Sequence, residues 1–305
     1  MPISKRAKTT KTAIRKFLKG ADRTLPGRRK ALDALDRAPR PRKVSYAETA
    51  LGGIPAIVAT PKEVVPERHI LYFHGGGYVV GSPKSHIAFG ARLAKRAAAS
   101  VTVIDYRLAP EHVYPAAIDD CVAAYRSLTS DVDPALITIA GDSAGGGAAL
   151  STMRTLRDAG DELPACAYLL SPWTDLTGSG ESVNSKAEAD PMIVAGHLVE
   201  AGGLYAGDTP LDDPGVSPLF ADLGGLPPML VQTGSDEVLL SDSTRLIERA
   251  QAVNVDAQLD LFDGMWHVFQ MFPGLPEAKE ALVRGATFIR SHTPAQASAG
   301  VTSTD

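Results

Sequence analysis

Cysteine is scarce in this sequence, with 2 among 305 residues. Cys121 and Cys166 stand at no metal-ligand spacing from a histidine, and both lie within apolar segments. Buried thiols are common in such surroundings. We therefore predict two inert core residues and no metal site built on cysteine.

Long apolar runs are absent as well. No stretch approaches the about 18 consecutive apolar residues that suggest a membrane-spanning helix. The basic N-terminus also lacks the apolar core of a signal peptide. On this basis we expect no integral membrane span, and we expect a cytoplasmic protein.

Acidic residues are few in the first part of the chain. Residues 1–43 hold 15 Lys and Arg but 3 Asp and Glu, although the net charge of the chain is -4. A basic arm of this kind can bind nucleic acid. The pI near 6.0, the lack of a nucleic-acid motif, and Phe17 as the one aromatic residue among the basic ones argue against that interpretation. We expect no nucleic-acid partner.

The hydrophobic content of 44% is enough to bury one large core in a chain of this length. Residues 1–43 form a separate basic arm with a narrow helical stripe of Ile14, Phe17 and Leu18. We place the main domain at 44–293. The Ala-, Ser- and Thr-rich tail at 294–305 is expected to be disordered.

Strand-like and helix-like segments alternate through the main domain. Residues 44–61 predict a hairpin around Gly52-Gly53. Short apolar runs predict strands at 70–73, 101–104, 137–140, 167–170, 229–232 and 257–262, and helical stretches lie at 87–99, 116–128, 144–158, 241–253 and 277–291. This order predicts an α/β protein with a mostly parallel central sheet and helices on both faces. Chemistry in such sheets sits at the carboxyl ends of the strands.

A strand, a tight turn and a helix meet at Gly141-Asp142-Ser143-Ala144-Gly145. The serine of a G-x-S-x-G turn has a strained backbone, and small neighbours let the strand and helix pack closely. The N-terminus of the following helix would stabilise negative charge near Ser143. We predict Ser143 as a nucleophile for acyl transfer.

A glycine run follows the first core strand, at His74-Gly75-Gly76-Gly77-Tyr78. Glycines can present consecutive backbone N–H groups to an anion because no Cβ blocks the approach. Together with the N–H of Ala144, this run would form an oxyanion hole. A phosphate-binding turn is less consistent with the sequence, because no Lys-Ser/Thr follows.

The base and the acid of the site are expected after the last two strands. His267 follows 257–262, whereas His69, His86 and His292 are better explained as surface or capping residues. Asp236 follows 229–232 and is our candidate for the group that orients His267. Glu237 and Asp242 are its rivals, and Asp242 fits better at the start of a helix.

These motifs resemble those of the hormone-sensitive-lipase-like esterases, the bacterial family IV carboxylesterases. The resemblance rests on the segments 74–77, 105–112, 115–120, 141–146, 171–173, 213–219 and 264–267. It implies an α/β-hydrolase fold, oxyanion N–H groups from Gly76, Gly77 and Ala144, and a His74 that props the glycine loop. The family usually has a proline after the aspartate, where this chain has Glu237.

The resemblance also implies a helical cap made from residues 1–43 and an insertion at about 182–207. Apolar residues of that insertion are Met192, Ile193, Val194, Leu198 and Leu204. We expect Tyr78, Trp173, Trp266 and Val268 around the substrate pocket, where Trp266 would narrow the acyl site. The sequence implies no metal and no organic cofactor, and a homodimer is possible.

A serine carboxylesterase for short- to medium-chain acyl esters is the function that the resemblance implies, with a Ser143, Asp236, His267 triad and an acyl-enzyme intermediate. A lactone or amide hydrolase with the same triad is the main alternative. A non-catalytic small-molecule receptor, like the plant gibberellin receptors, is a further alternative. Those receptors lack the catalytic histidine, so His267 argues against it.

Overall fold

The computed structural model describes residues 3–19, 24–34 and 39–294. The predicted tail at 294–305 therefore lies outside the described residues, except for Pro294.

Eight strands of the described chain form one sheet, in the order β1-β2-β4-β3-β5-β6-β7-β8. Strands β3 to β8 are mutually parallel, while β2 runs antiparallel to both β1 and β4. The strands are β1 (Val44–Leu51), β2 (Ile54–Pro61), β3 (His69–Phe73), β4 (Ser100–Ile104), β5 (Ile137–Asp142), β6 (Cys166–Leu170), β7 (Met229–Gly234) and β8 (Ala257–Phe262). The predicted hairpin and the mostly parallel sheet are both confirmed.

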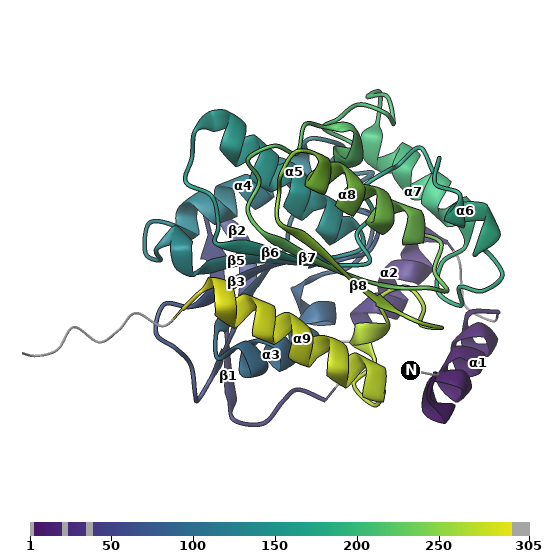
Figure 1. The fold of residues 1–305 in the computed structure, drawn as a ribbon, viewed down its shortest axis with the longest axis horizontal. Helices are drawn as coiled ribbons and strands as arrows, with labels where there is room; N and C mark the ends of the chain where they lie inside the picture. Colours follow the sequence, from purple (N-terminus) through teal and green to yellow (C-terminus); the bar gives the residue numbers. More distant parts are fainter. Residues whose placement is uncertain (1–2, 20–23, 35–38, 295–305) are drawn as a thin grey trace, which may run out of the picture.

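Helices cover both faces of the sheet (Figure 1). Helices α3 (Pro83–Ala97) and α9 (Pro276–His292) pack together on one face. The other face carries α4 (Ala116–Leu128), α5 (Ala144–Ala159) and α8 (Leu240–Ala252). This layered arrangement confirms the predicted fold class, and it directs the carboxyl ends of the parallel strands toward one edge.

Helix α3 begins four residues earlier than the sequence pattern suggested. The Ser82 hydroxyl accepts a hydrogen bond from the N–H of Ser85 at 3.3 Å, and the Ser85 hydroxyl accepts one from the N–H of Ser82 at 3.0 Å. This reciprocal cap and Pro83 in the first turn fix the start of the helix. As a result, His86 lies inside the helix rather than before it.

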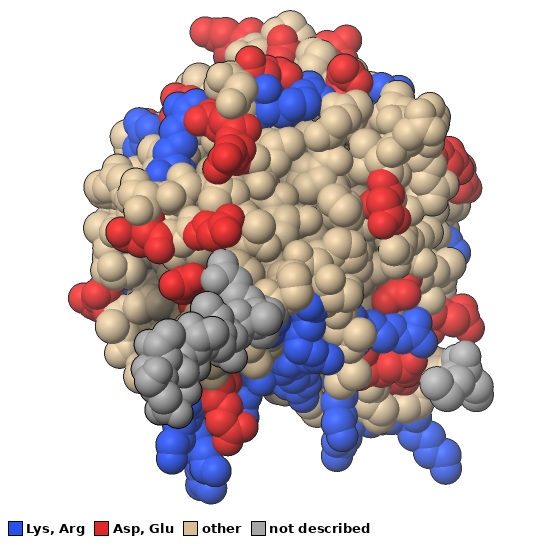
Figure 2. Space-filling model, turned by 60° about the vertical axis from the view of Figure 1, so that its left-hand side comes forward, with Lys and Arg blue, Asp and Glu red and all other residues tan. Residues whose placement is uncertain are grey.

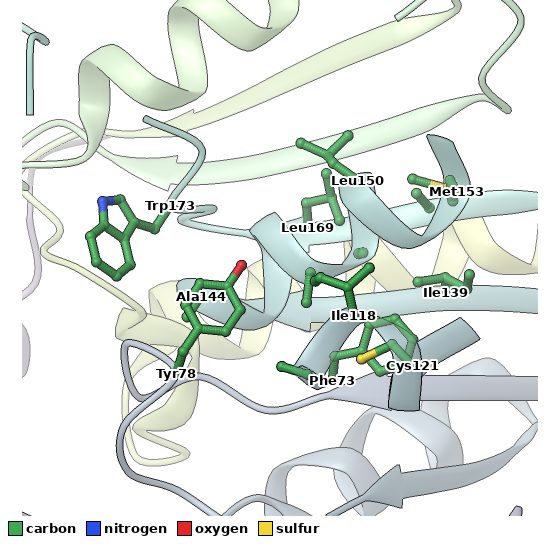
Figure 3. Close-up of a cluster of buried hydrophobic side chains, with 14 of the residues drawn as sticks. Phe73, Tyr78, Ile118, Cys121, Ile139, Ala144, Leu150, Met153, Leu169 and Trp173 are labelled. Atoms are coloured by element: carbon green, nitrogen blue, oxygen red, sulfur yellow. The ribbon is translucent and has the colours of Figure 1, made fainter. Parts of the chain in front are cut away.

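The core consists of one large buried cluster on each face of the sheet. Strand β5 is buried along its whole length because both faces are covered. Cys121 and Cys166 are buried in these clusters, as predicted. Burial raises the pKa of the Cys166 thiol to about 12. Figure 3 shows Trp173 and Tyr78 at one end of the first cluster, beside Ala144, and Met153 and Ile139 at the other.

Charged side chains occupy the margins of the face drawn in Figure 2. Lys and Arg side chains project from its lower edge, acidic and basic ones are mixed near its upper edge, and its centre is largely uncharged.

The N-terminal helices lie on the same side of the molecule as the segment at about 182–207, which is expected to form part of a cap (Figure 1). Helices α1 (Lys5–Lys19) and α2 (Leu25–Asp33) lie on the same side as α6 (Ser182–Ser185) and α7 (Ala195–Ala206) (Figure 1). Ala7 of α1 is buried, and Ile14 packs against the same small cluster, whose buried members include Phe262, Met265, Trp266 and Phe269. Phe17 is 71% exposed, so the predicted apolar stripe is buried only in part.

Removal of residues 1–19 should lower the melting temperature, because it uncovers this cluster and the partly buried Ile14. A fully buried large apolar side chain contributes about 1.5–3 kcal/mol, so we expect a decrease on the order of 5 °C. Differential scanning calorimetry of the full and truncated chains measures it. An unchanged melting temperature would show that α1 does not support the core.

Candidate active site

The nucleophile candidate Ser143 lies at the turn between β5 and α5. Its backbone has φ 53° and ψ -122°, which is a strained conformation for a residue with a side chain. A Cβ on Gly145 would overlap the carbonyl oxygen of Phe73, so this position requires glycine. The N–H of Ser143 donates to Leu170 at 2.9 Å, and its own carbonyl accepts from Trp173 at 2.9 Å. The turn is thereby fixed to the ends of β3 and β6.

The glycine loop after β3 is held by Asp142. The N–H of Gly75 donates to Asp142 Oδ1 at 3.0 Å, and the Tyr72 hydroxyl donates to the same oxygen at 2.7 Å. Burial alone would raise the pKa of Asp142, but His86 and the Tyr72 hydroxyl outweigh it and lower the pKa below its usual value. An ionised Asp142 therefore anchors the loop.

The oxyanion candidates lie on this loop and at the start of α5. Gly76 and Gly77 have φ of 125° and 63°, in the region that favours glycine. Within the described chain, the N–H groups of Gly76, Gly77 and Ala144 donate no hydrogen bond to another residue. Because of this, they are free to bind an oxygen atom of a ligand.

His74 lies beneath the glycine loop, as expected for a residue that supports it. Its ring stacks on Tyr106 with centroids 4.2 Å apart, and the Tyr106 hydroxyl donates to the His74 carbonyl at 2.6 Å. Burial lowers the pKa of His74 to about 3. His86 was expected at the surface or as a cap, but it is buried and its Nε2 lies 3.5 Å from Asp142 Oδ1.

The base candidate His267 lies in the loop after β8 and is 5% exposed. Burial lowers the pKa of His267 to about 4, with the charge of Asp142 acting in the opposite direction. Its Nδ1 is buried and has no hydrogen-bond partner among the described residues. A buried ring nitrogen of this kind needs a partner when the ring becomes charged.

The structure does not bring Asp236 to His267. The Asp236 side chain is 30% exposed, and its Oδ2 lies 2.5 Å from Lys11 Nζ on α1. The N–H of Asp236 donates to the Met265 carbonyl at 2.9 Å, so the two loops touch through the backbone. The Asp236 carboxylate is turned toward α1 instead, where it gains an ion pair.

The neighbouring carboxylate Glu237 is fully buried. Its Oε2 accepts from the Ser171 hydroxyl at 2.8 Å, and that hydroxyl in turn accepts from the N–H of Val268 at 3.1 Å. Thr233 donates to Oε1. Burial raises the pKa of Glu237 to about 8, and the charge of Asp190 adds to that increase. Glu237 is thus two hydrogen bonds away from the residue that follows His267.

The third acid, Asp242, has a structural role. Its Oδ2 accepts hydrogen bonds from the N–H groups of Thr174 and Asp175, both at 2.8 Å. Burial raises the pKa of Asp242 to about 7. Its position in the first turn of α8 is the one expected from the sequence.

Ser143 and His267 line one cavity of about 460 Å³. No hydrogen bond joins these two described side chains, which is common in the absence of substrate. Trp173 and Val268 line the cavity, as predicted, and so do Gly76 and Gly77. Tyr78 and Trp266 are absent from the described lining. Tyr78 stacks on Tyr205 with centroids 3.8 Å apart, and Trp266 is fully buried in the cluster beneath α1.

Both segments that are expected to form a cap contribute residues to this cavity. Met192, Ile193, Val194 and Leu198 line it from the segment at about 182–207, and Arg28 and Leu32 line it from α2. Sequence analysis did not identify Arg28, Arg92, His86 or His197 as lining residues. No local motif marks them, because they come from helices that meet only in the folded chain.

Comparison with known proteins shows the family to which this fold belongs. A family model described as an alpha/beta hydrolase fold matches residues 70–271. An acetyl-hydrolase of Streptomyces hygroscopicus is 37% identical over 269 residues, which cover 83% of this chain and 90% of that relative. An esterase of known crystal structure from the bacterial hormone-sensitive lipase family has 38% sequence identity to this chain. The match covers 96% of this chain and 100% of that esterase, with a TM-score of 0.92. The chain belongs to the hormone-sensitive-lipase-like carboxylesterases.

A further relative, an esterase of Acinetobacter venetianus, is 41% identical to this chain over 226 residues. These residues cover 73% of this chain and 74% of that relative. As a member of this family, the esterase described here is a carboxylic ester hydrolase. In the described part of the chain, no three His, Cys, Asp or Glu side chains gather to hold a metal ion. None of the described helices is long and apolar enough to cross a membrane.

The buried Glu237 should lower the stability of the folded esterase as pH rises. Its pKa is about 8 in the folded chain and 4.5 as the usual value, so the folded state holds the proton more tightly. Stability is therefore full below the usual value and is lost as pH rises toward the folded value. The side chain of Glu237→Gln stays neutral at every pH. The melting temperature of this variant should therefore rise relative to that of the wild type as pH increases from about 5 to about 8. A constant difference between the two proteins would contradict the raised pKa.

Proposed function

We propose that the esterase hydrolyses acyl esters through an acyl-enzyme on Ser143. His267 takes the proton of the Ser143 hydroxyl as its oxygen attacks the ester carbonyl, and it returns the proton to the leaving alcohol. The N–H groups of Gly76, Gly77 and Ala144 stabilise the oxyanion. Water then attacks the acyl-enzyme, and His267 acts as base again. The observation that carries this proposal is the shared cavity of Ser143, His267 and the glycine loop.

We assign the acid of the triad to Glu237 in place of Asp236. Asp236 is committed to Lys11 and partly exposed. Glu237 is buried and is linked through Ser171 to the backbone of Val268. Nδ1 of His267 lacks a partner among the described residues and needs an acceptor in the charged state. A cationic His267 would also favour the ionised form of Glu237, since opposite charges lower the pKa of a carboxyl group.

The cavity supports esters with short to medium acyl chains. Most of its lining is apolar, including Val79, Phe89, Leu198 and Phe272. Its volume of about 460 Å³ falls within the usual range of small-molecule sites. The cap residues Met192 and Val194 are exposed at 36% and 42% while they line the cavity, so the cap forms part of its mouth.

Lactones and amides remain the alternative substrates, because the same serine chemistry cleaves them. A receptor without catalysis is disfavoured, since Ser143, His267 and the glycine loop are all present at one cavity. The cytoplasmic location, the cap role of residues 1–43 and 182–207, and a homodimer stay predictions.

Ser143→Ala should abolish turnover of short-chain nitrophenyl esters, with a decrease of about 10³–10⁶-fold and an unchanged melting temperature. A panel of nitrophenyl esters from acetate to palmitate, beside a lactone and an anilide, measures both rate and substrate class. A fluorophosphonate should label the wild type at Ser143, as read by peptide mass mapping. Substantial turnover by the folded variant, or labelling at another serine, would refute the assigned nucleophile.

Glu237→Gln and Asp236→Asn distinguish the two candidate acids. We expect Glu237→Gln to lower kcat by about 10²–10⁴-fold, because His267 loses the charge that stabilises its imidazolium. Asp236→Asn breaks the ion pair with Lys11 and should lower kcat by no more than about tenfold. Steady-state kinetics with nitrophenyl butyrate measure both. The reverse order of effects would restore Asp236 as the acid.

A further inference from the structure

Asp190 joins two segments of the chain through its buried carboxylate. Its Oδ1 accepts hydrogen bonds from the N–H groups of Met192 at 2.8 Å and Ile193 at 3.3 Å. Its Oδ2 accepts from the N–H of Val238 at 3.1 Å. The residue is 6% exposed. One side chain therefore satisfies three backbone donors, which belong to the cap and to the loop after β7.

Both segments contribute to the site. Met192 and Ile193 line the cavity. Val238 directly follows Glu237 and is fully buried. A displacement of Val238 would move Glu237 with it, because adjacent residues share a peptide plane. The Asp190 carboxylate thus links the cavity wall to the backbone that carries the proposed acid.

Helix α1 contacts the same two segments, the one around Asp190 and the loop after β7, through two basic side chains. Lys11 and Arg15 are four residues apart and so lie on one face of the helix. Lys11 Nζ lies 2.5 Å from Asp236 Oδ2, in the loop that carries Glu237. Arg15 Nη2 donates to the carbonyls of Glu188 at 2.8 Å and Ala189 at 2.9 Å, just before Asp190.

The charges around Glu237 come from several elements. Asp190 of the cap raises the pKa of Glu237, and burial raises the pKa of Asp190 itself to about 6 while Lys11 acts in the opposite direction. Asp236 is next in the chain and is paired with Lys11. His267 lies in the loop that Ser171 connects to Glu237. The cation Lys11 pairs with Asp236 and lowers the pKa of Asp190.

We propose that Asp190, together with the Lys11 and Arg15 face of α1, is a positioning clamp for Glu237. The clamp fixes the loop after β7 against the cap, so that Glu237 keeps its place beside the histidine loop. It rests on the proposed assignment of Glu237 as the triad acid. These side chains act through Glu237 and have no part in bond making. A misplacement by about 1 Å can cost about 10²-fold in rate, so the effect is measurable.

Lys11→Met tests the clamp on a partly exposed residue that the fold should tolerate. We expect kcat for nitrophenyl butyrate to fall about tenfold, while KM stays within about twofold. Lys11→Arg should recover most of the activity, because it can keep the ion pair with Asp236. The matched control is Lys8→Met on the same helix, where Lys8 is exposed, and it should match the wild type.

The pH profile separates positioning from simple loss of stability. Lys11→Met removes a cation and should shift the acid limb of kcat/KM to higher pH, since Glu237 becomes harder to ionise. Asp190→Asn removes a negative charge and should shift the same limb to lower pH, while its lost bond to Val238 lowers kcat about tenfold. Lys8→Met should leave the limb in place.

The clamp is overturned if Lys11→Met keeps the kcat and the pH limb of the wild type, or if it lowers only the melting temperature. Shifts of both variants in the same direction would overturn it as well. If Asp190→Asn fails to fold, the Lys11 series alone decides. An inactive Glu237→Gln together with an unaffected Lys11→Met refutes the clamp and leaves the triad in place. An active Glu237→Gln refutes the acid itself.

Discussion

The close approach of Gly145 to the end of β3 is the contact on which the site depends. The Phe73 carbonyl occupies the space that a Cβ of residue 145 would need. This contact lets α5 start directly against the sheet, and it places Ser143 in its strained conformation beside the glycine loop. A larger residue at position 145 would separate the helix from the strand, and Ser143 and the glycine loop would move apart.

Buried carboxylates organise the surroundings of that contact. Asp142 binds the glycine loop, Asp190 binds the backbone of Met192, Ile193 and Val238, and Asp242 binds the backbone that follows Trp173. Each carboxylate accepts hydrogen bonds from backbone N–H groups in loops, where no helix or sheet supplies an acceptor. Because a buried acceptor without partners is costly, these side chains hold irregular loops in single arrangements.

Glu237 is buried among these loops and has an unusual pKa for a carboxyl group. Its burial raises the pKa to about 8, which disfavours the charged form in the resting enzyme. In the mechanism that we propose, the same burial makes the charge of Glu237 effective once His267 becomes cationic, since the interaction of two charges is stronger in a poorly solvated site. The nearby ion pair between Lys11 and Asp236 is partly exposed, so its charges interact less strongly than charges in the buried site.

The sequence by itself determined the sheet, the hairpin, and the positions of Ser143, the glycine loop and His267 after strands, because each depends on a local pattern. Alternating apolar runs and helical stretches specify strands and helices, and the turn at Ser143 requires glycines at fixed spacing. The folded structure decided how the two acids after β7 are placed. Asp236 and Glu237 are adjacent and both carry a carboxyl group, so the sequence alone does not distinguish them, but consecutive side chains point in different directions. Only the packing of α1, β6 and the loop after β8 turns Asp236 toward Lys11 and buries Glu237 beside Ser171. The cavity walls from α2, α3 and α7 were likewise beyond a local pattern, because they combine residues that are distant in the chain.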